Sequence, residues 1–187
     1  MSPFEFFFSF YGLVLGLSVV ELVAGVARVL HAGRGYRFGV LTPLLAAFVL
    51  ADITSFWAFA WVDLRGVQVS YAALIGALAI AGLYYVAASL VFPREPLTES
   101  ADAHFWRHRR TVLLAIMGCN LPVFGLALMR NFDGGWPALL IVAFCVYYSV
   151  LLIAALAPRR RTVLVALMLA NLIYVLQFAG SVRGILI

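Results

Sequence analysis

The chain alternates between long apolar segments and short polar breaks, and this pattern dominates its other features. Because the hydrocarbon core of a bilayer is about 30 Å thick, an α-helix crosses it with roughly 20 mainly apolar residues. Six segments are long enough, and they comprise residues 4–30, 38–62, 67–92, 111–129, 136–157 and 162–182. The pattern therefore predicts an all-α integral membrane protein with six transmembrane helices.

The breaks between these segments have the composition of turns. Gly33–Gly35, Asp63–Gly66 and Asn131–Gly135 each combine glycine with a charged or amide residue, which is typical of tight connections. The longest break, Pro93–His104, contains prolines and acids and is predicted to be a linker. No segment is polar and long enough to form a soluble domain, so residues 1–187 are predicted to form a single six-helix transmembrane domain.

Composition supports a membrane protein and excludes several other classes. The chain is 65% hydrophobic and 11% charged, whereas soluble domains are about 45–50% apolar and about 25% charged. All 13 basic residues are arginine, and the absence of lysine excludes a lysine nucleophile or a Schiff base. The arginines occur in the predicted loops rather than along one helix, so no nucleic-acid partner is expected.

The distribution of arginine predicts an orientation. The first, third and fifth breaks, with the helix ends beside them, carry ten arginines, and the opposite side carries Arg65, Arg130 and Arg183. Positively charged loops remain in the cytoplasm, so both termini are predicted to lie outside, in the periplasm or extracellular space. A lysine-free composition rich in alanine, leucine, valine and arginine favours GC-rich bacterial coding, and hence a bacterial inner membrane.

A weak internal repeat is visible. Residues 16–28 contain a glycine, polar residue, glycine and arginine in an order that loosely resembles residues 118–130. Two three-helix halves in tandem would have opposite topology, which is the inverted-repeat arrangement of many transporters. Apolar helices also align with one another through composition alone, so both interpretations stay open.

Two carboxylates, Glu21 and Asp52, fall inside predicted spans. A carboxylate near the bilayer centre costs about 2.5–3.5 kcal/mol on insertion scales. Arg28 shares a helical face with Glu21, but two turns separate them by about 10.5 Å along the axis. We therefore expect Arg28 to extend toward the membrane surface and both acids to lack a cation. Acids in that position would hold protons, which suits a proton relay or proton–cation exchange.

Other polar residues fall at similar depths in the predicted spans. Polar side chains face lipid only at a cost, so they are expected to form a seam between the helices. The residues predicted to line a pathway with Glu21 and Asp52 are Ser18, Ser55, Asn120, Tyr147, Asn171, Tyr174 and Gln177.

The sequence lacks the common catalytic motifs, including the hydrolase serine motif, the zinc-protease motif and the Walker motif, so no catalytic residue is predicted. His104 and His108 have the spacing of two metal ligands on a helix. The neighbouring Arg107, Arg109 and Arg110 would oppose a divalent ion. We therefore predict an interfacial anchor on anionic headgroups here, and no metal or other cofactor.

These observations favour a small bacterial transporter or channel in which Glu21 and Asp52 handle protons or a small cation. A chain of 187 residues leaves little wall around a central pathway, so a homo-oligomer in the lipid bilayer is expected. One alternative is a non-transporting scaffold or sensor subunit whose polar seam only fixes helix packing. A less favoured alternative is an intramembrane lipid-modifying enzyme that uses both carboxyls.

Overall fold

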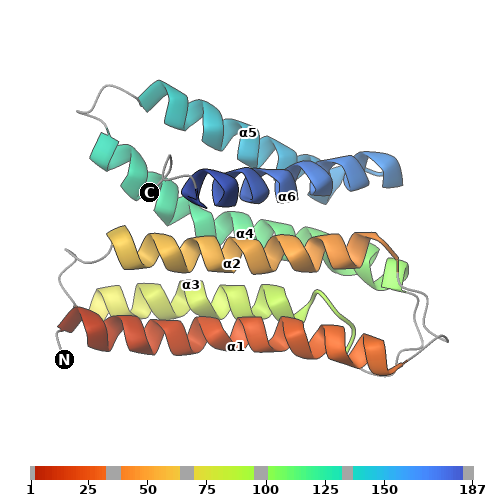
Figure 1. Cartoon of the computed structure of the whole chain (residues 1–187), viewed down its shortest axis with the longest axis horizontal. Coiled ribbons are helices and arrows are strands. Elements are labelled where there is room, and N and C mark those ends of the chain that lie inside the picture. Colours follow the sequence, from red (N-terminus) through yellow and green to blue (C-terminus); the bar gives the residue numbers. More distant parts are fainter. Residues whose placement is uncertain (1–2, 33–38, 64–69, 95–100, 132–136, 183–187) are drawn as a thin grey trace.

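The described residues form a bundle of six α-helices (Figure 1). The computed structural model describes residues 3–32, 39–63, 70–94, 101–131 and 137–182. The helices are α1 (Pro3–His31), α2 (Leu41–Asp63), α3 (Tyr71–Ser89), α4 (Ala101–Asn131), α5 (Pro137–Leu156) and α6 (Arg160–Val182). All six are long and apolar enough to cross a membrane, which confirms the prediction of an all-helical, multi-pass membrane fold.

Successive helices run in opposite directions, so α1 begins and α6 ends at the same end of the bundle (Figure 1). The other end joins α1 to α2, α3 to α4 and α5 to α6. We call it the arginine-rich end, because the described residues there include Arg28, Arg94, Arg107, Arg109, Arg110, Arg159, Arg160 and Arg161. The segregation of arginine to one end of the molecule is therefore a property of the fold.

Helix α2 holds the bundle together. It packs against α1, α3, α4 and α6, whereas α1 packs mainly on α3, and α5 lies against α4 and α6. Within its most apolar window α2 is 44% buried, against 17–28% for the other helices. Its buried apolar residues fall mainly at spacings of three, four and seven positions, and they are Leu41, Leu45, Ala46, Phe48, Val49, Ile53, Phe56 and Ala60. This spacing places a continuous apolar face in the core.

The two halves of the chain pack differently. In the first half α1 packs closely on α3, whereas in the second half α5 packs against both α4 and α6. The inverted repeat stays a prediction.

The helix boundaries differ from the sequence-based ones mainly between α3 and α4. The linker predicted to extend to His104 is wrong at its C-terminal end, because α4 already begins at Ala101. Asp102 lies in the first turn, where a carboxylate interacts favourably with the helix dipole, and it forms an ion pair of 3.2 Å with Arg160. The ring of His104 lies 3.0 Å from the carbonyl oxygen of Leu90. These tertiary contacts favour helix where the local sequence suggests a linker.

Arg109 is also placed differently from the prediction of an interfacial anchor. Its side chain is buried, and its guanidinium stacks 3.9 Å from the ring centre of Trp106. It donates hydrogen bonds of 3.2 Å to the carbonyl of Ala154 and 2.7 Å to that of Ala157. Ala154 lies in the last turn of α5 and Ala157 directly follows the helix, where backbone carbonyls have no donors within the helix. Arg109 therefore caps α5 from α4, and the predicted surface role is wrong for this residue.

Replacing Arg109 tests this cap. Arg109→Leu leaves the two carbonyls without donors and is expected to cost about 2 kcal/mol, or roughly 4–8 °C in melting temperature. The melting temperature of detergent-purified protein measures the effect. Arg110→Leu, at an exposed neighbouring position, should change it little, and an equal loss in both variants would contradict the capping role.

Candidate functional site

Asp52 lies at the midpoint of α2, eleven residues from either end of the helix. Its side chain is only 1% exposed. A buried carboxylate is strongly unfavourable unless its oxygens receive hydrogen bonds or pair with a cation. The groups around Asp52 therefore determine whether a carboxylate is tolerated at this position.

Four side chains donate hydrogen bonds to Asp52, each from a different helix. The hydroxyls of Tyr84 (α3) and Tyr147 (α5) lie 2.7 Å from its two carboxylate oxygens, Oδ2 and Oδ1 respectively. The hydroxyl of Tyr174 (α6) donates to Oδ1 as well. The amide nitrogen of Asn120 (α4) lies 3.0 and 3.1 Å from the two oxygens. We call these five residues the Asp52 cluster; they join five of the six helices.

The donors also contact one another. The Tyr147 and Tyr174 hydroxyls are 3.3 Å apart, and the amide of Asn120 lies 3.3 Å from the Tyr147 hydroxyl. A second hydrogen of that amide can bond to the carbonyl of Ile116, at 3.0 Å. Because a tyrosine oxygen can accept as well as donate, the cluster can accommodate either an ionised carboxylate or a neutral carboxyl that donates to a tyrosine.

Apolar side chains enclose the cluster. The ring of Phe56 lies 5.3 Å from that of Tyr84, and the ring of Phe48 lies 5.8 Å from that of Tyr174. Both phenylalanines are buried on α2, one turn to either side of Asp52. Electrostatic interactions at Asp52 are therefore stronger than they would be in water.

Three more of the predicted residues connect α6 to α2 outside the cluster. The amide of Gln177 donates a 3.2 Å hydrogen bond to the hydroxyl of Ser55, about one turn from the cluster. Asn171 donates to the backbone carbonyl of Leu44 at 3.1 Å and not to Asp52. The two helices thus carry a seam of polar contacts, of which only the central part involves the carboxylate.

Glu21 does not share these partners, and the expectation that it lacks a cation is wrong. Its Oε1 lies 3.3 Å from the guanidinium of Arg28 and 3.8 Å from that of Arg94. Helical side chains lean toward the N-terminus, so the long Arg28 side chain spans the two turns that separate it from Glu21. Arg94, which follows α3, approaches from another part of the chain. Glu21 therefore belongs to an arginine cluster toward the arginine-rich end.

Ser18 is among the residues predicted to line the pathway, and Tyr84 is not. Ser18 is fully buried, and its hydroxyl has no hydrogen-bond partner among the residues that the structure describes. Tyr84 is also fully buried, on a face of α3 that otherwise carries the small residues Ala81, Ala87 and Ala88. In the sequence, a single tyrosine at helical spacing among alanines could have indicated that Tyr84 is buried and hydrogen-bonded.

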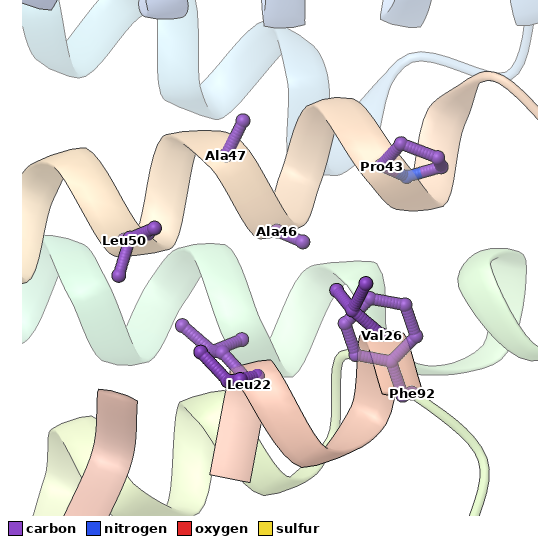
Figure 2. A pocket seen from close by; sticks show the side chains of 8 residues that line it. Leu22, Val26, Pro43, Ala46, Ala47, Leu50 and Phe92 are labelled. Atoms are coloured by element: carbon purple, nitrogen blue, oxygen red, sulfur yellow. The ribbon is translucent and has the colours of Figure 1, made fainter. Parts of the chain in front are cut away.

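A separate hollow of about 270 Å³ lies between α1 and α2 (Figure 2). It is lined by Leu22, Val23, Val26, Pro43, Ala46, Ala47, Leu50 and Phe92. All of these side chains are apolar, and Asp52 is not among them. Within the described parts of the chain, no three His, Cys, Asp or Glu side chains are arranged to hold a metal ion.

Comparisons with protein families, with characterised proteins and with solved structures found no match to this chain.

The hydrogen bonds to Asp52 are predicted to contribute to the free energy of unfolding. Tyr84→Phe removes one donor from a buried acceptor and is expected to lower the free energy of unfolding by about 1–3 kcal/mol. Unfolding followed by circular dichroism during titration of dodecyl sulfate into detergent micelles measures this. The matched control is Tyr85→Phe, at an exposed side chain, which should change the free energy by less than about 0.5 kcal/mol.

A double-mutant cycle makes that test specific. If Tyr84 acts through Asp52, the effects of Tyr84→Phe and Asp52→Asn should couple by about 1 kcal/mol or more. Additive effects would show that the hydroxyl stabilises the protein in another way.

Proposed function

We propose that this protein is a small membrane transporter or channel in which Asp52 binds and releases a proton or a small cation. The observation that supports this most is a carboxylate, 1% exposed at the centre of the bundle, whose hydrogen-bond donors among the described residues are all neutral. An acid inside a membrane-spanning bundle is a functional-site hypothesis by default, because its burial is costly.

The chemistry of the Asp52 cluster is compatible with binding either a proton or a small cation. A proton arriving at Asp52 can be accommodated if one tyrosine hydroxyl reverses and accepts a hydrogen bond. A small hard cation would instead use carboxylate, hydroxyl and amide oxygens, which are the ligands that such ions prefer. Next to Tyr174, which contacts the carboxylate, Ser55 and Gln177 extend the polar seam by one turn and are the proposed continuation of the path.

Access to Asp52 is proposed to require helix movement. Its side chain has almost no exposed surface, and its charge attracts donors from α3, α4, α5 and α6. Neutralising that charge weakens all of these contacts together, since hydrogen bonds to charged groups are the stronger ones. Binding of the cargo would thus be coupled to the packing of four helices around α2.

Proton flux into liposomes tests the proposal. Vesicles containing the protein and the pH-sensitive dye pyranine are given a potassium diffusion potential with valinomycin, with and without a sodium gradient. Wild-type protein should acidify the lumen faster than empty vesicles, and Asp52→Asn should reduce the rate at least tenfold while remaining folded.

The matched control is the other membrane carboxylate. Glu21→Gln should retain more than half of the wild-type flux, because Glu21 is paired with arginines and does not touch the cluster. Equal loss of flux in both variants would contradict a path centred on Asp52. Absence of flux in the wild type under every gradient would favour the second candidate.

That second candidate is a scaffold or sensor subunit whose cluster is purely structural. This candidate is favoured because both carboxylate oxygens of Asp52 accept hydrogen bonds from neighbouring side chains. It predicts a lowered melting temperature in Asp52→Asn and no flux in any variant. The enzyme alternative has less support, since Glu21 and Asp52 have separate sets of partners.

The proposed setting is a bacterial inner membrane, with both termini outside and the protein assembled as a homo-oligomer. Alkaline phosphatase fused after Ile187 in a bacterial host should be active, and green fluorescent protein at that position should be dark. Fusions truncated at Arg161 should behave in the opposite way, because the arginine-rich end is expected to remain in the cytoplasm. The reverse pattern would overturn the orientation.

A further inference from the structure

The face of α6 that touches Asp52 changes from buried to exposed along its length. Leu167, Ala170, Tyr174, Gln177 and Ser181 follow one another at spacings of four and three residues, so they share this face. Leu167 and Ala170 are fully buried. Tyr174 is partly exposed, and Gln177 and Ser181 are exposed. Helix α6 is therefore closely packed toward the arginine-rich end and open toward the end at which it finishes, which we call the opposite end.

The same change occurs on α4 and α5. Toward the arginine-rich end, the residues four and seven positions from Asn120 and from Tyr147 are fully buried, and they are Leu113, Ile116, Leu151 and Ala154. Toward the opposite end, none of the described side chains at residues 121–129 of α4 or 138–146 of α5 is buried. The helices α5 and α6 also diverge toward that end (Figure 1). The closely packed core of these three helices thus ends at the level of Asp52.

The members of the Asp52 cluster differ in exposure in the same sense. Tyr84 on α3 is fully buried, whereas Asn120, Tyr147 and Tyr174 are each partly exposed. Toward the opposite end α2 stays packed on α1, where the ring of Phe8 lies 5.0 Å from that of Trp61. The approach to the carboxylate therefore lies on the side of α4, α5 and α6.

An exposed polar contact marks this approach. The amide of Gln177 is exposed and donates to the hydroxyl of Ser55, which lies three residues from Asp52 on α2. An amide exposed to hydrocarbon is unfavourable, because its remaining hydrogen-bonding groups have no partner there. Water at this position would satisfy them, and it would stand about one turn from the carboxylate.

We propose that water enters the bundle from the opposite end as far as Ser55 and Gln177, and that Asp52 exchanges its proton or cation with that side. This inference rests on the function proposed for Asp52 and gives it a direction. Exposing Asp52 toward the opposite end requires movement of its partly exposed donors, whereas exposing it toward the arginine-rich end requires separation of a packed core. The structure is therefore the state that is closed on the arginine-rich side.

Cysteine accessibility in lipid nanodiscs tests the sidedness. In a background of Cys119→Ser and Cys145→Ser, Ser55→Cys and Val49→Cys place a thiol three residues to either side of Asp52. The charged reagent 2-(trimethylammonium)ethyl methanethiosulfonate reacts with thiols that water reaches. Ser55→Cys should react at least tenfold faster than Val49→Cys, which is fully buried in the packed core. Both membrane faces are open to reagent in a nanodisc, so the result does not depend on orientation.

Thr54→Cys is the matched control for exposure to lipid. Thr54 has the depth of Ser55 and is more exposed, but it lies on the side of α2 that faces away from Asp52. Its thiol should react at least tenfold more slowly than that of Ser55→Cys. Equal rates for Ser55→Cys and either of the other variants would overturn the proposal. Melting temperatures confirm that each variant is folded.

Proton flux separates this inference from the function on which it rests. Ser55→Cys that is modified before reconstitution should show at least fivefold lower flux than the same variant left unmodified, because the reagent adds bulk and positive charge beside Asp52. Equal labelling rates with flux that still requires Asp52 would overturn the sidedness alone. The expected labelling without flux in wild-type protein would instead overturn exchange at Asp52.

Discussion

The burial of one carboxylate constrains the whole bundle. Asp52 can occupy the middle of α2 only if donors reach both of its oxygens, because an unsatisfied carboxylate in an apolar interior is prohibitively unfavourable. The donors come from α3, α4, α5 and α6, so this requirement fixes the rotation and depth of four helices relative to α2. Apolar contacts between such helices are less selective, since lipid tails compete for the same surfaces.

The sequence predicts the six spans well because hydropathy and turn residues are local properties. It also predicts that Asn120, Tyr147 and Tyr174 lie at the depth of Asp52, since depth follows from counting residues along a helix. Rotation about the helix axis is not predictable in this way. In a bilayer both the core face and the lipid face of a helix are apolar, so the pattern cannot indicate that Tyr84 faces Asp52 and Asn171 does not.

Contacts between distant segments account for the other differences. The pairing of Glu21 with Arg94 depends on Phe92 packing against Gly25, and nothing in the sequence near Glu21 indicates this. The early start of α4 and the burial of Arg109 depend likewise on α3, α5 and α6. Loops of a membrane protein are too short and polar for periodicity to be informative, so their structure follows from what they pack against.

The two membrane carboxylates are stabilised in different ways, and this difference bears on function. Glu21 is neutralised by arginines, so a proton that binds there must leave two guanidinium groups without their counter-ion. Asp52 is stabilised by neutral hydroxyl and amide groups, which leave its negative charge uncompensated. Such a charge can be cancelled by a proton or a small cation without breaking an ion pair, and its neutral donors can reorient at little cost. Of the two acids, Asp52 is therefore the one that the proposal of reversible proton or cation binding selects.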